Sequence, residues 1–146
     1  WIFVTGGCWR REIYNPLRCA LRELEEETRG VVALKNGEYT EFKFVVNESP
    51  TVELEYNVFI FFVDYTRSEQ LTQIQCFYDE KRKTTIKKIM NQPIRKTHDE
   101  HDYMSYDTRE EFNTRKRWKL IVDNVLNNPE FYACISSPDR KTFSIK

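Results

Sequence analysis

A helix near the N-terminus is the strongest local constraint on the fold, because both of its ends are marked in the sequence. Asn15 before Pro16 is typical of a helix start, with Asn as the N-cap and Pro at the first helical position. Gly30 can take the left-handed conformation that ends a helix. The segment predicts an amphipathic helix over 16–28. Its apolar residues recur at helical spacing and form one buried stripe: Leu17, Ala20, Leu21 and Leu24.

Several other segments favour β-structure. The run 51–65 alternates at first and is then apolar on both sides, as in a central strand. Asn36-Gly37 is a turn signal typical of a hairpin. Strands are predicted over 1–4, 31–34, 39–46, 51–65 and 98–106.

Two further helices are predicted, over 68–88 and over 108–128. Thr108 is followed three residues later by Glu111, which is the spacing of a capping box. Strands and helices in mixed order predict an α+β chain. The length of 146 residues is that of one domain with a real core, so residues 1–146 are interpreted as a single domain.

The predicted architecture is a mixed sheet built from 1–65 and 98–126 and flanked by helices. The chain starts at Trp1 inside an apolar run, so we expect the N-terminal part of this fold to lie upstream. No run is long enough for a membrane span, the most apolar being 58–63. Four cysteines without a CxxC pair are interpreted as free thiols in a reducing compartment, which predicts a cytoplasmic protein without a membrane partner.

Lys plus Arg and Asp plus Glu number 23 each, so the net charge excludes no partner, but the charges are unevenly placed. On the predicted helix, Glu23, Glu26 and Glu27 share one face beside the apolar stripe, and Glu25 falls on the other flank. Such carboxylates repel one another unless a cation lies among them. Mg²⁺ and Mn²⁺ prefer oxygen ligands, so this face predicts a metal site for phosphates. The alternative is a solvated face with i,i+4 ion pairs, such as Arg22 with Glu26.

The stretch from Gly6-Gly7 through "NPLRCALRELEEETRGV" resembles the Nudix box. In that family pattern a Gly and five residues precede a Glu, and seven more precede Arg-Glu-apolar-x-Glu-Glu-x-Gly-apolar. The second half matches in order and spacing, and the likeness covers about residues 1–31. The pattern's first Glu falls on Tyr14, with Glu12 as the nearest glutamate, and the closing Gly30 comes one residue late.

This resemblance implies a Nudix-type α/β/α sandwich that hydrolyses a nucleoside diphosphate linked to another group, using Mg²⁺ or Mn²⁺. It implies that the helical carboxylates of Glu23, Glu26 and Glu27 are catalytic metal ligands. Arg22 would orient Glu26, and Gly6 would offer its carbonyl to a metal. Bound metal lowers the pKa of water and stabilises charge on phosphoryl oxygens, so the chemistry agrees.

The family adds one more acid late in the domain, before an aromatic residue and a capped helix. The stretch "HDEHDYMSYDTREEF" fits this description, with Glu100 as the expected catalytic acid and Asp102 or Asp99 as alternatives. His98 and His101 offer a second interpretation of the same stretch, as ligands of zinc or iron.

The substrate is indicated by two features. "CALRELEEETRG" is similar to the box of mRNA-decapping Nudix enzymes, including those of large DNA viruses. The tract 81–96, inside an insertion over 66–97, holds seven Lys or Arg and no acid. This tract is compatible with binding of an RNA backbone and equally with an ordinary solvated helix face. Capped RNA is the expected partner, with small nucleotides, ADP-ribose or diphosphoinositol phosphates, or a non-catalytic binding role, as alternatives. The expected substrate-binding residues are Lys81, Arg82, Lys83, Lys87 and Lys88.

Overall fold

The chain was analysed as a computed structural model that describes residues 4–116 and 118–145. Its content is α+β, as the order of apolar patterns predicts, with a three-stranded sheet and five α-helices among the described residues. The chain forms two compact units. One unit contains 35–63 and the chain from 116 onward, and the other contains 4–34 and 64–115.

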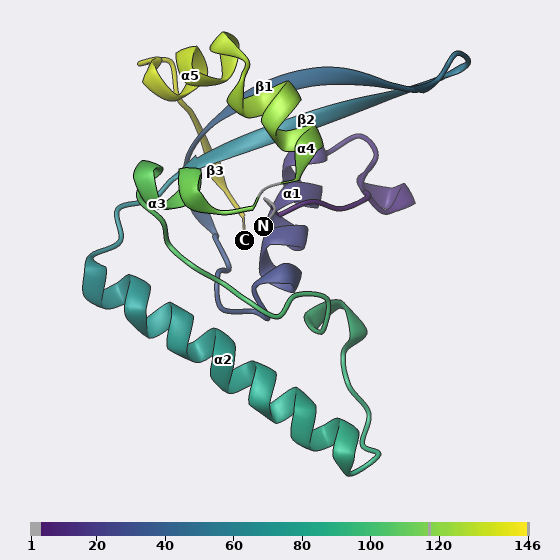
Figure 1. Cartoon of the computed structure of the whole chain (residues 1–146), viewed down its shortest axis with the longest axis vertical. Coiled ribbons are helices and arrows are strands. Elements are labelled where there is room, and N and C mark those ends of the chain that lie inside the picture. Colours follow the sequence, from purple (N-terminus) through teal and green to yellow (C-terminus); the bar gives the residue numbers. More distant parts are fainter. Residues whose placement is uncertain (1–3, 117, 146) are drawn as a thin grey trace. The chain divides into compact units, whose positions relative to one another are not determined.

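The sheet belongs to the first unit. Its strands are β1 (Asn36–Ser49), β2 (Val52–Phe62) and β3 (Lys141–Ser144), in the order β2-β1-β3. β1 and β2 form a long hairpin (Figure 1) in which Phe42 faces Val58. Both pairings are antiparallel, so the prediction of a mixed sheet is wrong for the described strands. A direct hairpin connection permits only antiparallel pairing, because parallel strands need a long crossover.

A small aromatic core fixes the sheet unit. Alternate residues of β1 point to one face, where they meet α4 (Lys119–Ile121), the π-helical turn η3 (Val122–Leu126) and α5 (Pro129–Ser136). Asn128 caps α5 by accepting a hydrogen bond from the backbone of Glu130, at 3.0 Å. The buried members of this core are Phe42, Phe44, Ile121, Val125 and Phe131.

The second unit is helical. It contains the short 3-10 helices η1 (Arg10–Glu12) and η2 (Lys96–His98) and the helices α1 (Pro16–Glu27), α2 (Arg67–Ile89) and α3 (Arg109–Thr114). Each long helix starts at a side-chain cap: Asn15 for α1 and Thr66 for α2. The predicted start at Asn15-Pro16 and the helix predicted over 68–88 are confirmed, whereas the cap at Thr66 was not predicted. So is the capping box of Thr108 with Glu111.

The strand positions are confirmed in part. The strand predicted over 39–46 lies within β1, and the strand predicted over 51–65 contains β2, which ends at Phe62. The turn does not lie at Asn36-Gly37, which begins β1. The hairpin closes instead after Ser49, whose hydroxyl accepts hydrogen bonds from the backbone of Thr51 and Val52. A serine that bonds the backbone two or three residues on is itself a turn signal.

Two predicted strands are absent because side chains engage their backbone. In 31–34, the N–H of Val32 donates to the hydroxyl of Thr28 at 3.0 Å and so continues the end of α1. In 98–106, the carbonyl of His101 accepts from a guanidinium, and the segment holds η2 and a loop. The strand predicted over 1–4 lies largely outside the described residues.

The helix predicted over 108–128 is broken into α3, α4 and η3. Arg115 leaves helical geometry, with ψ 150°, and its guanidinium pairs with Asp107 just before α3 at 2.6 Å. The apolar stripe continues beyond the break, where Ile121 and Val125 are buried. Tertiary pairing therefore ends a helix that the sequence pattern alone would continue.

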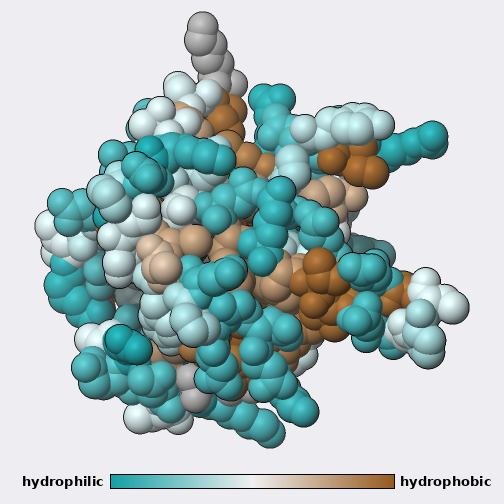
Figure 2. All heavy atoms as spheres, turned by 90° about the horizontal axis from the view of Figure 1, so that it is seen from above, coloured by the Kyte–Doolittle hydropathy of each residue, from teal (hydrophilic) through white to brown (hydrophobic). Residues whose placement is uncertain are grey.

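Hydrophilic side chains cover much of the face shown in Figure 2, and apolar side chains gather only in places between them. The most exposed large apolar residues lie just before α1 (Ile13 and Tyr14), at the end of α2 (Ile89) and in the loop after η2 (Tyr103). Single exposed apolar residues are ordinary for a folded protein. Among residues 4–116 and 118–145, no helix has the length and apolar character needed to cross a membrane.

Candidate metal centre

Helix α1 carries most of the candidate site, and its ends are fixed by side-chain hydrogen bonds. Asn15 Oδ1 accepts from the N–H of Arg18 at 3.2 Å, and Thr28 Oγ1 donates to the carbonyl of Leu24 at 2.7 Å. Leu21 is buried, whereas the rest of the predicted stripe is half-buried. The helix therefore presents its acidic C-terminal half in a defined rotation.

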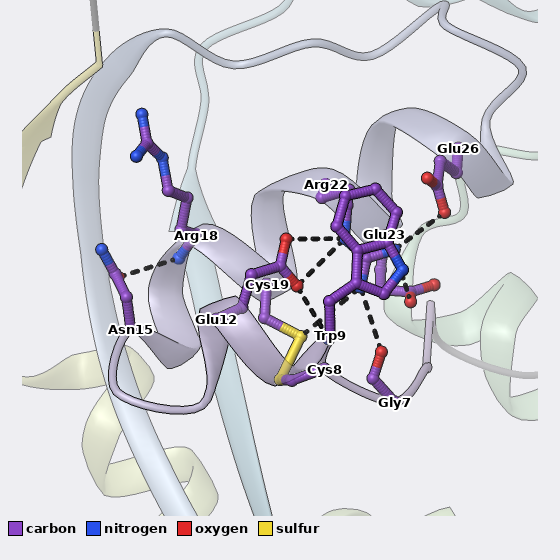
Figure 3. Close-up of a disulfide and its surroundings, with 10 residues drawn as sticks. All are labelled: Gly7, Cys8, Trp9, Glu12, Asn15, Arg18, Cys19, Arg22, Glu23 and Glu26. Carbon is purple, nitrogen blue, oxygen red and sulfur yellow. Dashed lines mark hydrogen bonds and ion pairs between the residues drawn. A yellow bond between two sulfur atoms is a disulfide. The ribbon is translucent and has the colours of Figure 1, made fainter.

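Arg22 joins the acidic groups of the helix to the preceding loop (Figure 3). Its Nε donates to Glu12 at 2.8 Å, and its Nη1 lies 3.1 Å from Glu23 Oε1 and 3.0 Å from Glu26 Oε2. Its Nη2 donates to the carbonyl of Gly7 at 3.0 Å. The predicted pairing of Arg22 with Glu26 is therefore present, within a larger network than the i,i+4 rule describes.

The loop before α1 is also closed covalently. Cys8 and Cys19 form a disulfide, so the prediction of four free thiols is wrong for these two, and Cys76 and Cys134 are free. The guanidinium carbon of Arg22 lies 3.9 Å from the centre of the Trp9 ring in this loop. Sequence spacing did not reveal this pair, because connectivity follows from proximity in the fold.

Glu27 connects the helix to the late acidic stretch of the same unit. Its Oε2 accepts from the N–H of Thr5 at 3.1 Å and lies 3.3 Å from Nε2 of His101. One ligand atom each from Glu27, Glu100 and His101 lie within 4.8 Å of one another. Two carboxylate oxygens and an imidazole nitrogen at this spacing suit Mn²⁺, Zn²⁺ or Fe²⁺, and Mg²⁺ less well.

The three helix carboxylates are largely covered by other side chains. The side chains of Glu23, Glu26 and Glu27 are 13%, 6% and 5% exposed. Basic side chains cover them: Arg22, Arg95 and His101. Sequence patterning places a residue on a helix face, but not the side chains that later segments lay over it.

Burial changes how these acids titrate. Removal from water raises the pKa of the Glu23 carboxyl, and the negative charges of Glu26 and Glu100 act in the same direction against Arg22. Burial also raises the pKa of Glu27, which His101 partly offsets. A carboxylate with a raised pKa is costly to ionise, and a bound cation would relieve that cost.

Glu12 is the functional candidate that sequence reasoning missed. It is 7% exposed, and its hydrogen bond with Arg22 holds the pKa of its carboxyl low. The signal was present in the spacing: five residues separate Gly6 from Glu12, as in the family pattern. Nine residues, instead of seven, then separate Glu12 from Arg22, so counting back from the arginine arrived at Tyr14, which is 97% exposed.

Gly6 lies directly against the acidic group. A Cβ at this position would overlap the carboxylate of Glu23, so the absence of a side chain allows the close approach. Glu25, expected on the outer flank, is half-buried, and no hydrogen bond or ion pair of its carboxylate occurs among the described residues. The structure therefore brings Gly6 and Glu23 together and leaves Glu25 outside the network.

Of the late acids, Glu100 joins the group around Glu27. Asp99 pairs with Lys88, and Asp102 lies near Lys81 at 3.8 Å, so both engage α2 instead. His98 is absent from the group, and its Nε2 is buried without a hydrogen-bond partner among the described residues. The paired-histidine interpretation is thus met by one histidine only.

The basic tract lies along α2 and is mostly matched by acids. Arg82 pairs with Asp79, Lys83 pairs with Glu80 at 2.9 Å, and Lys88 and Lys81 engage the late acids. Lys87 is exposed. A hollow of about 500 Å³ opens on the helix and is lined by Tyr78, Lys81, Arg82, Thr85 and Ile86.

No protein-family model matches this chain, and neither a curated protein nor a solved structure matches it at a significant level. The geometry of the second unit therefore has to carry any assignment of function.

Proposed function

We propose that this protein is a metal-dependent hydrolase that cleaves a pyrophosphate bond in a nucleoside diphosphate linked to another group. One observation carries the proposal. Glu27, Glu100 and His101 offer ligand atoms within 4.8 Å of one another, and the largely covered carboxylates of Glu23 and Glu26 lie on the same helix as Glu27. Three candidate ligands with two further carboxylates next to a glycine loop are more than an ordinary charged helix face requires.

In the proposed mechanism, neighbouring side chains bind the metal, accept a proton and orient the carboxylates. Glu27, Glu100 and His101 would hold a divalent ion, with Mn²⁺ the better fit and Mg²⁺ the alternative. When bound, such an ion lowers the pKa of water and neutralises phosphoryl oxygens. Glu23 or Glu26 would accept the proton of the attacking water. Arg22, fixed by Glu12, would orient both carboxylates.

The finer assignment to the Nudix family, with its α/β/α sandwich, is part of this proposal. Its support is the match of Arg22-Glu23-Leu24-x-Glu26-Glu27 to the box, and the buried contact of Glu12 with Arg22. Capped RNA is the preferred substrate, supported by the exposed basic side of α2 and by Lys81 lying 5.2 Å from the ring of Tyr103. Small nucleotides, ADP-ribose and diphosphoinositol phosphates are the alternatives.

The test is a panel of capped RNA, ADP-ribose, dinucleoside polyphosphates and diphosphoinositol phosphates, incubated with Mn²⁺ or Mg²⁺ and analysed by product identity. The wild-type protein should release a nucleoside mono- or diphosphate, or phosphate from the inositol substrate. Glu26→Gln removes one charge at nearly constant volume and should lower turnover by about 100-fold or more, in the range of one proton-transfer group.

Glu25→Gln is the matched control, because it makes the same chemical change one residue away and outside the network. It should keep wild-type turnover. Absence of metal-dependent turnover on every substrate, with the fold intact, would refute the enzyme and favour a binding module. Equal losses in the two variants would refute the role of Glu26.

A further inference from the structure

Arg29 occupies an unusual place at the end of α1. It follows the C-cap Thr28, is 4% exposed, and has a φ of 58°. A left-handed conformation is sterically strained for an L-residue with a side chain, whereas glycine adopts it freely. Gly30, which takes the conformation freely, is the next residue. A buried arginine in this position indicates that its side chain has a structural task.

The guanidinium of Arg29 joins three segments of the helical unit. Its Nη2 donates to the carbonyl of His101 at 2.8 Å and lies 3.6 Å from Asp99 Oδ1. Its Nη1 donates to Thr84 Oγ1 of α2 at 3.4 Å. Its guanidinium carbon lies 5.3 Å from the ring centre of Phe77, which is 1% exposed. A planar fork with a ring contact needs arginine and is poorly imitated by lysine.

These contacts fix the late acidic segment relative to the helix. The carbonyl that Arg29 binds belongs to His101, whose imidazole lies 3.3 Å from Glu27. Arg29 follows Glu27 by two residues. The same helical turn therefore carries the candidate ligand Glu27 and binds the segment that carries Glu100 and His101. The other contacts of this segment with α2 include the ion pairs of Lys88 and Lys81 and a hydrogen bond from Lys81 to the carbonyl of Asp102 at 3.1 Å. Both lysines are partly exposed, and exposed ion pairs stabilise little.

We propose that Arg29 is a positioning residue: its guanidinium holds residues 99–101 against the end of α1, so that Glu100 and His101 stay within reach of Glu27. This hold of Arg29 on residues 99–101, called the Arg29 clamp below, is present in the metal-free protein. Its consequence for metal affinity rests on the proposed function.

The principal test variant is Arg29→Gly, which removes the guanidinium and accepts a φ of 58° without strain. Two quantities are measured on the full chain: amide hydrogen exchange over 98–103 without metal, and the Mn²⁺ dissociation constant by electron paramagnetic resonance of free Mn²⁺. Exchange over 98–103 should accelerate while that of α1 stays protected. The Mn²⁺ dissociation constant should rise about 10-fold or more, as for loss of an outer-shell partner.

Two further measurements separate positioning from general destabilisation. Methylguanidinium, added to Arg29→Gly, should restore most of the lost Mn²⁺ affinity by filling the vacated site. Arg29→Lys serves if the glycine variant does not fold. It keeps the charge but loses the fork, and should show faster exchange over 98–103 and a several-fold weaker Mn²⁺ affinity.

Unchanged exchange over 98–103 in the folded variants would overturn the clamp, whatever the metal does. Weaker Mn²⁺ affinity that methylguanidinium fails to restore, with protection lost across the unit, would also overturn it in favour of a purely structural role. A wild-type protein that binds no Mn²⁺ would refute the proposed function separately, and the exchange data would still decide the clamp.

Discussion

At the scale of single residues, the candidate site is a set of acids kept in unfavourable surroundings. Glu27 is buried and Glu23 is largely covered, and both carboxyls have a raised pKa, because removal from water disfavours their charged form. Glu12 has the opposite tendency, because its bond with Arg22 favours the carboxylate. The residues therefore divide into a supporting pair, Glu12 with Arg22, and a group that a cation would stabilise.

The stability of Glu27→Gln tests this division. A raised folded pKa gives a contribution to stability that is full below the unfolded value of about 4.3 and is lost as pH rises through the folded pKa. At pH 7 without metal, ionised Glu27 therefore costs stability, and Glu27→Gln should unfold at higher urea concentration than wild type. Near pH 4 the advantage should vanish.

Mn²⁺ should make the wild type more stable than Glu27→Gln at pH 7. The wild type should gain about 2.7 kcal/mol at a metal concentration 100 times its dissociation constant, and the variant, with one ligand oxygen lost, should gain less. Glu25→Gln, outside the network, is the control and should match wild type in both conditions. A variant less stable than wild type at pH 7 in chelator would contradict the assignment.

Among the secondary-structure elements, α2 contributes both to the contacts of Arg29 and to the proposed RNA-binding surface. Its inner side holds Phe77 and Thr84, which contact Arg29, and its outer side carries the basic tract. Salt bridges along the helix, such as Lys83 with Glu80, neutralise part of that tract. Exposed pairs of this kind exchange readily for other partners, because solvent screens them and each stabilises the helix only weakly.

RNA binding by α2 is tested by neutralising side chains away from the metal group. Changing Arg82, Lys83 and Lys87 to Gln should weaken binding of single-stranded RNA and reduce the slope of log affinity against log salt by about 2, if each contacts one phosphate. Hydrolysis of a small nucleotide should stay unchanged. The matched control changes three exposed lysines of the other unit: Lys43, Lys119 and Lys141. A slope unaffected by the first set, or equally affected by both, would show that the tract is ordinary surface.

At the scale of the whole molecule, the described chain divides into an antiparallel sheet unit and a helical unit, and all candidate ligands belong to the second. Local signals sufficed for the boundaries of α1, because Asn15 and Pro16 act within one turn. They also selected Glu23, Glu26, Glu27 and Arg22, since helical spacing alone brings these together.

Features that depend on distant segments were beyond sequence reasoning. Arg29 meets the carbonyl of a residue 72 positions away, and no local pattern encodes that contact. The disulfide of Cys8 with Cys19 is likewise not indicated by the sequence spacing. Val32 is a local case: its N–H donates to the hydroxyl of Thr28, four residues earlier, and so does not pair in a strand. Side-chain hydrogen bonds therefore override the strand propensity of 31–34.

The proposed function requires that the acids of α1 and the segment after η2 bind at least one divalent ion. Crystals of the wild-type protein soaked in Mn²⁺ and measured at the manganese absorption edge test this requirement. We expect an anomalous peak at coordination distance from Glu27, Glu100 and His101, which should be lost from crystals of Glu27→Gln. Manganese elsewhere, or none at saturating concentration in crystals with these side chains ordered, would contradict it.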